Sequence, residues 1–277
     1  MSLDIFAAPW WVSMLITLAL IAVGAVYALG WGELRRAFPN VIDVRRLAAF
    51  MAGLFVLWIA VASPLAALDH QFLTAHMAQH LVLMTIAAPL LLVGCPIVTI
   101  LHGLSGHAAH RLLRPLRNSH VQTLGSVVAH PAFCWFIGTA TVIAWHVPAL
   151  FEAGMQSESW HAVEQASFIA AGLLFWWPII VPWPSIARWS QWTAPLYLFL
   201  ATLPCDALSS FLTFCDRVVY PHYQSADRAL TPSAIGDQEI AGALMWIWVT
   251  FAYLAPAAVL TIRALSPLRR PAQVEFV

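Results

Sequence analysis

The residues of this sequence best suited to bind a metal ion are four histidines, a glutamate and two methionines. His76 and His80 are four residues apart, and His161 and Glu164 are three apart, so each pair lies on one face if its segment is helical. Imidazole suits copper and zinc, a carboxylate ligates or orients imidazole, and a thioether favours Cu(I). The predicted ligands of a copper ion are therefore His76, His80, His146, His161, Glu164, Met77 and Met84.

The segments that must position these residues are long and apolar. Of the 277 residues, 61% are hydrophobic and 9% are charged, which leaves too few polar side chains to cover a water-soluble domain. A helix needs about 20 apolar residues to cross a bilayer core of about 30 Å. Apolar runs of this length without alternation exclude a β-barrel and predict an all-α, polytopic membrane protein, a seven-transmembrane helix bundle forming one integral membrane domain over residues 1–277. The predicted spans are residues 10–30, 47–65, 74–96, 132–150, 163–182, 194–214 and 238–261.

The distribution of arginine predicts the orientation, because short Arg-rich loops stay in the cytoplasm. The sequence has no lysine, and only two of its 13 arginines, Arg217 and Arg228, fall in a loop predicted to lie outside. The arginines predicted to lie inside are Arg35, Arg36, Arg45, Arg46, Arg111, Arg114, Arg117, Arg188, Arg263, Arg269 and Arg270. The N-terminus is therefore expected outside and the C-terminus in the cytoplasm, with the chain in the lipid bilayer of the inner (plasma) membrane. Sparse arginines and a net charge of zero also exclude a nucleic-acid partner.

On this topology three spans bring histidines to the outer side of the membrane. Span three begins there with His76 and His80, and span four ends there near His146. Span five begins there with His161 and Glu164. Ionisable groups at membrane depth are costly and face the bundle interior, so we expect these residues to form one site beneath the outer surface. The sequence does not decide whether four further residues belong to this site: His70, His222, Cys205 and Asp206.

Four stretches of the chain carry distinctive motifs. They are HMAQHLVLMTIAAPLLLVGCP from His76, AWHVPALFEA from Ala144, HAVEQASFIAAGLLFWWP from His161, and FLTFCDRVVYPHY from Phe211 together with GDQEIAGALMW from Gly236. In these stretches the sequence resembles the multi-span CtaG family of cytochrome c oxidase assembly factors, over about residues 45–262. The matching motif positions are His76, Met77, Gln79 and His80 for HMxQH, Trp145, His146 and Pro148 for WHxP, and His161 and Glu164 for HxxEH. The second histidine of HxxEH is replaced by Gln165 in this chain.

The resemblance implies that the protein is not an enzyme but a membrane assembly factor for a haem-copper cytochrome c oxidase, acting at its copper-loading stage. Its expected partners are cytochrome c oxidase subunits, with a periplasmic copper chaperone as a further candidate. The residues themselves place the copper at the histidine cluster near the outer surface.

Three other functions use the same residues differently. Paired histidines on facing helices could ligate haem in a membrane oxidoreductase, although we find no second layer of histidines across the bilayer. Broken helices and Asp206 could line the path of a metal transporter or channel, although the sequence shows no repeat. A scaffold could clamp an oxidase subunit with purely structural histidines.

Overall fold

The computed structural model describes residues 10–38, 43–104, 106–115, 118–180, 192–224 and 233–266, and all its regular elements there are helices. The long α-helices are α1 (Trp10–Ala37), α2 (Val44–Ala62), α8 (Pro131–Trp145), α10 (Glu158–Ile180), α11 (Thr193–Phe214) and α12 (Ala234–Leu265). The shorter α-helices are α3 (Leu73–Val82), α4 (Ala88–Val93), α5 (Pro96–Gly103), α6 (Gly106–Leu113), α7 (Ser119–Val128) and α9 (Pro148–Gln156). The 3₁₀ helices η1 (Pro64–His70) and η4 (Pro221–Gln224) and the π-helical turn η2 (Leu83–Ala87) complete the order.

Among the described residues, six helical segments are long and apolar enough to cross a membrane, and a bent pair, α7 with α8, makes a seventh if it counts as one span. The six are α1, α2, the continuous segment Leu73–Val93, α10, α11 and α12. Large apolar side chains such as Ile21 of α1 and Phe251 of α12 are 63% and 71% exposed, which suits a surface covered by lipid. The prediction of an all-α membrane helix bundle is confirmed.

The fourth predicted span, residues 132–150, differs from the structure. Its helix ends at Trp145, and a separate helix, α9, begins at Pro148. Proline lacks the backbone N–H that would continue the preceding helix, and its ring disfavours helical backbone in the residue before it. The 15 residues of α8 are too few to cross a bilayer core alone, and α7 meets α8 at an angle of 61°.

The third span changes its helical register in the middle. The turn Leu83–Ala87 is π-helical, and in that register the N–H of residue 89 would pair with the carbonyl of Met84. Residue 89 is proline and has no N–H, so the Met84 carbonyl instead accepts a hydrogen bond of 3.0 Å from the indole of Trp176 on α10. The register change therefore fixes α10 against the third span.

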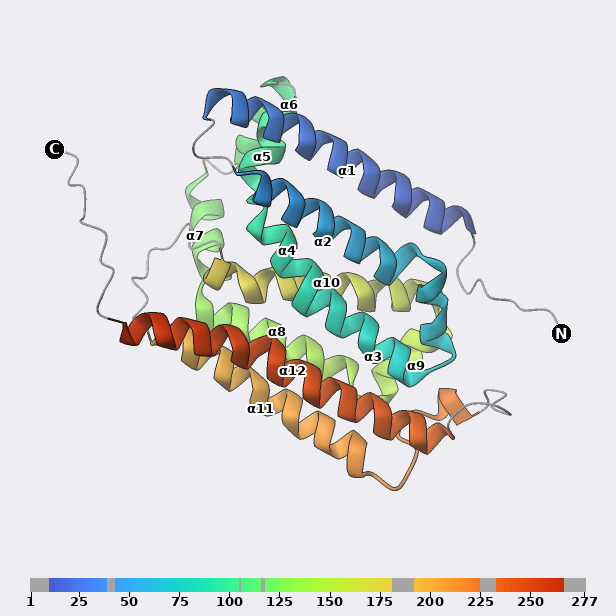
Figure 1. Cartoon of the computed structure of the whole chain (residues 1–277). Coiled ribbons are helices and arrows are strands. Elements are labelled where there is room, and N and C mark those ends of the chain that lie inside the picture. Colours follow the sequence, from blue (N-terminus) through green and yellow to red (C-terminus); the bar gives the residue numbers. More distant parts are fainter. Residues whose placement is uncertain are drawn as a thin grey trace.

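The two ends of the molecule differ in composition. Figure 1 shows the C-terminal ends of α1 and α12 on the same side as α5, α6 and α7, with α9 and the first turns of α3 on the opposite side. The described arginines of α1, α2, α6 and α12 belong to the first of these ends. Arg117, Arg188, Arg228, Arg269 and Arg270 lie outside the described residues.

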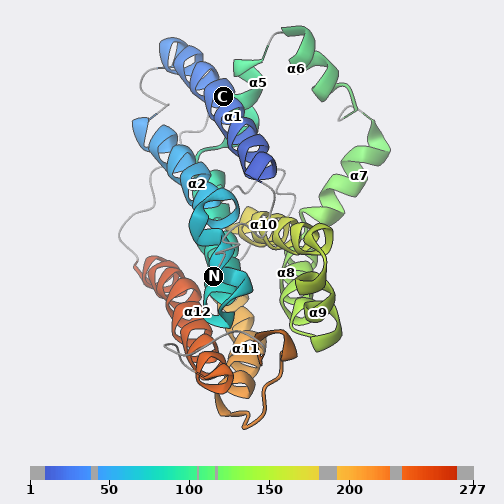
Figure 2. The same cartoon turned by 90° about the vertical axis from the view of Figure 1, so that its right-hand side faces the viewer.

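Helices α1 and α5 pack against each other at very close range (Figure 2). A Cβ atom added at Gly30 would overlap the carbonyl of Thr99, and one added at Gly103 would overlap the carbonyl of Val26. Because glycine has no side chain, the two helix backbones can approach to this distance. The close van der Waals packing that results holds the helices together inside a bilayer, where no hydrophobic effect drives helices to associate.

Candidate metal centre

His76 and His80 face one another on α3, as their spacing predicts. Their Nε2 atoms are 2.8 Å apart, and both side chains are buried. At this distance only one hydrogen can lie between the two nitrogens, so one ring donates and the other accepts. The pair is held from both sides by aromatic rings, since Phe168 stacks on His80 at 4.0 Å and Phe151 lies 4.9 Å from His76.

Glu164 of α10 completes a group of three around these nitrogens. Its Oε1 lies 3.4 Å from the Nε2 of His76 and 3.2 Å from the Nε2 of His80. Its side chain is only 1% exposed, and its other oxygen lies 3.5 Å from the Nδ1 of His161, one turn earlier on the same helix. We call His76, His80 and Glu164 the inner group.

Asp69, which the sequence analysis did not select, is the partner of His161. The Nε2 of His161 lies 2.9 Å from the Oδ2 of Asp69, and Asp69 is buried in η1. Burial opposes ionisation of this carboxyl, but the hydrogen bond with His161 and the charges of the neighbouring histidines together outweigh it and hold the pKa of Asp69 below its ordinary value. The signal available in the sequence was an acidic residue directly before His70 in the short connection between the second and third spans.

His70 and His222 lie next to this pair. The rings of His70 and His161 are 5.1 Å apart, and the Nε2 of His222 is 3.3 Å from the carbonyl oxygen of His70. Burial lowers the pKa of His70 below its ordinary value, so the ring is neutral at neutral pH. Neutral imidazole is the form that binds metal ions.

The polar atoms of this cluster are under-satisfied. Both Glu164 oxygens and the Nδ1 atoms of His76, His80 and His161 are buried without a hydrogen bond in the described part of the chain. Buried polar groups are nearly always paired, so such a concentration of unpaired polar atoms needs an explanation, of which an ion is one. A tetrahedral ion with bonds of about 2.0 Å separates its ligand atoms by about 3.3 Å, close to the separations within the inner group.

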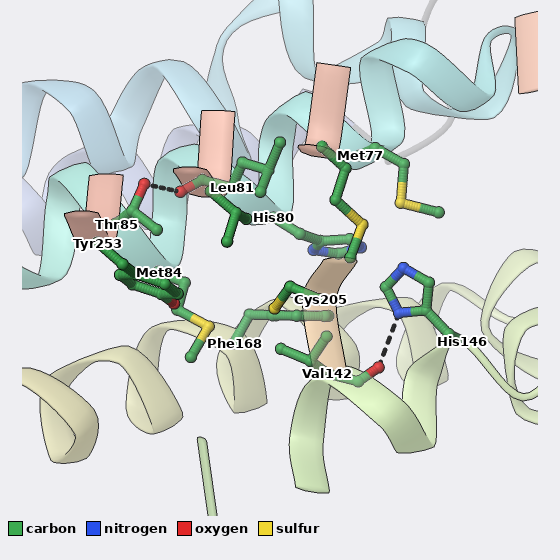
Figure 3. A pocket seen from close by; sticks show the side chains of 12 residues that line it. Met77, His80, Leu81, Met84, Thr85, Val142, His146, Phe168, Cys205 and Tyr253 are labelled. Atoms are coloured by element: carbon green, nitrogen blue, oxygen red, sulfur yellow. Dashed lines mark hydrogen bonds between the residues drawn. The ribbon is translucent and has the colours of Figure 1, made fainter. Parts of the chain in front are cut away.

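The structure places His146 near this cluster but outside the inner group. Its Nδ1 lies 2.7 Å from the Val142 carbonyl, and its Nε2 is buried without a partner among the described residues. A small cavity of about 30 Å³ is lined by His146, His80 and Met77. Figure 3 shows the rings of His146 and His80 on either side of it. Met84 and Cys205 line the same cavity, which is large enough for one water molecule or ion.

Hydrogen bonds with two other helices, α12 and α2, fix the orientation of α3. The side chain of Asp237, on α12, accepts hydrogen bonds of 2.8 Å and 3.2 Å from the backbone N–H groups of Leu73 and Thr74. Asp237 is buried and caps α3, where the N-terminal N–H groups favour a negative charge. Gln79 donates a hydrogen bond of 2.6 Å to the carbonyl of Ala60 and ties α3 to α2.

Gly154 allows α9 to cover the buried carboxylate. A Cβ atom at this position would lie 3.0 Å from the Oε2 of Glu164.

Asp206 takes no part in the cluster, although one of its oxygens is buried and unpaired within the described residues. All four cysteines are free.

The fold and this cluster define a class: a polytopic α-helical membrane protein with a buried group of imidazoles and carboxylates near one end of its helices. Within that class, the chain belongs to the cytochrome c oxidase caa3 assembly factor family (Caa3_CtaG), which its residues 25–266 match. No solved structure matches it significantly.

The chain is also similar to longer mycobacterial proteins. It is 26% identical over 251 residues to the uncharacterized protein ML1998 of Mycobacterium leprae (strain TN), covering 87% of this chain and 37% of that protein. It is 28% identical over 247 residues to the uncharacterized protein Mb0105 of Mycobacterium bovis, covering 86% of this chain and 36% of that protein. The chain thus spans little more than a third of the length of these relatives.

Proposed function

We propose that this protein is a non-enzymatic assembly factor that holds copper at the inner group, His76, His80 and Glu164, and helps to load it into a haem-copper cytochrome c oxidase. Membership of the caa3 assembly factor family supports the role in oxidase assembly. The copper proposal rests on one observation: two buried imidazole Nε2 atoms lie 2.8 Å apart, and the Glu164 carboxylate lies within 3.4 Å of both. Its partners are oxidase subunits and, as donor, a periplasmic copper chaperone.

Copper suits these residues better than the other common ions. Imidazole binds both copper and zinc, and a cavity that His80 also lines contains two thioethers, Met77 and Met84, of the kind that favours Cu(I). His146 faces that cavity and offers a further nitrogen. The same cavity, at about 30 Å³, has no room for a porphyrin, which counts against the haem alternative.

We place the copper site on the outer side of the plasma membrane. The arginines at the C-terminal ends of α1 and α12 and at the start of α2 gather at the opposite end of the helices from α9 (Figure 1). Because positively charged loops stay in the cytoplasm, this arrangement supports an outer N-terminus and a cytoplasmic C-terminus. Copper held there is accessible to a periplasmic donor and to the external face of an oxidase.

The test is the copper content of the full chain purified in detergent. The wild type should retain about one copper ion or more per chain, and a His76→Ala, His80→Ala double variant should lose most of it, because both replacements remove inner ligands. A His102→Ala variant serves as the control, because His102 is exposed and distant in sequence from the cluster. In cells, the double variant should lower the amount of active oxidase; normal oxidase activity together with unchanged copper content would refute the proposal, and a Soret band would revive the haem alternative.

A further inference from the structure

A second set of ligand-type side chains overlaps the inner group. Asp69, His76 and His161 each place one ligand atom within 4.8 Å of the others, and all three are buried. We call them the outer group. His76 belongs to both groups, so an ion held by one group is already bound to one residue of the other.

The outer group borders a cavity that the inner group does not reach. This cavity, of about 400 Å³, lies between the first turns of α1, the end of α2, η1 and the start of α10. Asp69 and His161 form part of its wall, together with the exposed residues Glu158 and Ser159. His76, His80 and Glu164 are not among its lining residues, so Asp69 and His161 are the members of the outer group that border it. A cation that enters from this side therefore meets the outer group first.

His161 connects the two groups through its two ring nitrogens. Its Nε2 lies 2.9 Å from Asp69, and its Nδ1 lies 3.5 Å from Glu164 of the inner group. His70, also in the cavity wall, places its ring 5.1 Å from that of His161. The buried carboxylate of Asp69 makes this wall of the cavity attractive to a cation.

We propose that Asp69, His76 and His161 form a second copper position, at which the ion is captured from the cavity before it passes to His76, His80 and Glu164. This inference rests on the proposed function. An ion binds only to a ring nitrogen with a free lone pair, so the hydrogen that His161 shares with Asp69 and the one between His76 and His80 move to the Nδ1 atoms of their own rings, and each imidazole stays neutral. The transfer exchanges Asp69 and His161 for His80 and Glu164 while His76 stays bound, and no electron moves.

The test compares the rate of copper loading with the final copper content. The full chain in detergent is mixed with Cu(I) supplied from a coloured chelator complex, and loading is followed by loss of the chelator colour. Asp69→Asn keeps the size of the side chain and should slow loading by about tenfold or more, as expected for the loss of one charged partner at a metal position, while the final copper content stays that of the wild type. Glu158→Gln removes a charge from the same cavity without touching the outer group, and its rate should stay within about twofold of the wild type.

A second pair of variants tests directly whether the outer group binds copper. His80→Ala removes an inner ligand and should still bind copper weakly through the outer group, whereas His80→Ala combined with Asp69→Asn should bind none. Loading of Asp69→Asn at the wild-type rate, or equal slowing by Glu158→Gln, would overturn this inference and leave the proposed function intact. A wild-type chain that binds no copper would overturn both. If Asp69→Asn does not purify, His161→Gln, which can still hydrogen-bond to Asp69, replaces it with the same expected slowing.

Discussion

Replacing Glu164 by glutamine probes the metal centre with the least change of shape. The glutamate side chain is 1% exposed, and its carboxylate lies 3.2–3.5 Å from nitrogens of three histidines. Glutamine has the same size and keeps one carbonyl oxygen, so it removes the charge and leaves the packing of α10 in place. We expect copper affinity to fall while the chain still folds.

The size of the effect follows from the charge that is removed. A carboxylate and a monovalent cation about 2.1 Å apart attract each other by about 8 kcal/mol at an effective dielectric constant of about 20. The amide oxygen of glutamine recovers much of this attraction, because it remains a ligand atom and is easier to desolvate. A net loss of about 2.8 kcal/mol is expected, which corresponds to about a hundredfold increase in the copper Kd.

The assay is a competition titration of Cu(I) between the purified chain and a chelator of known affinity. Glu158→Gln, which removes a charge from an exposed position on the same helix, is the matched control and should change Kd by less than about threefold. Thermal unfolding of the copper-free proteins shows whether the variants are equally folded. An unchanged Kd in Glu164→Gln, measured on a folded protein, would show that Glu164 is not a ligand and would refute the reasoning.

Three further substitutions test other parts of the structure. Gly154→Ala puts a Cβ atom 3.0 Å from the Glu164 carboxylate, so it should weaken copper binding by about tenfold in the same titration. Unaltered binding would show that α9 can move away from Glu164 without disturbing the carboxylate. Asp237→Ala removes the cap of α3 and should lower the free energy of unfolding by about 1–2 kcal/mol, seen as a lower melting temperature; a melting temperature equal to that of the wild type would contradict this role. Gly30→Ala should force α1 away from the Thr99 carbonyl and cost about 1–3 kcal/mol of stability, with Gly32→Ala, where nothing lies within 4 Å, as the neutral control.

Most of the helical architecture could be predicted from the sequence. Apolar runs of sufficient length determine where a chain can cross a bilayer, because every backbone group in hydrocarbon must be paired within its own helix. The segment Leu73–Val93 and helix α10 therefore lie close to the predicted spans 74–96 and 163–182. The error at 132–150 arose because hydropathy does not register the break at Pro148 that ends one helix and begins another.

The sequence by itself determined the pairs that lie on one helix. The spacing of His76 and His80, and that of His161 and Glu164, sets each pair on a common face through the periodicity of the helix alone. The motifs around the same residues indicated the assembly factor family, which the match over residues 25–266 shows.

Tertiary structure decided which of these faces meet. Asp69 reaches His161 across 92 residues of sequence, and Asp237 caps α3 from 164 residues away. His146 follows the last residue of α8, which ends at Trp145, and it faces a separate cavity beside His80. No periodicity encodes such contacts, because the rotation and depth of each helix depend on how the side chains of its neighbours pack.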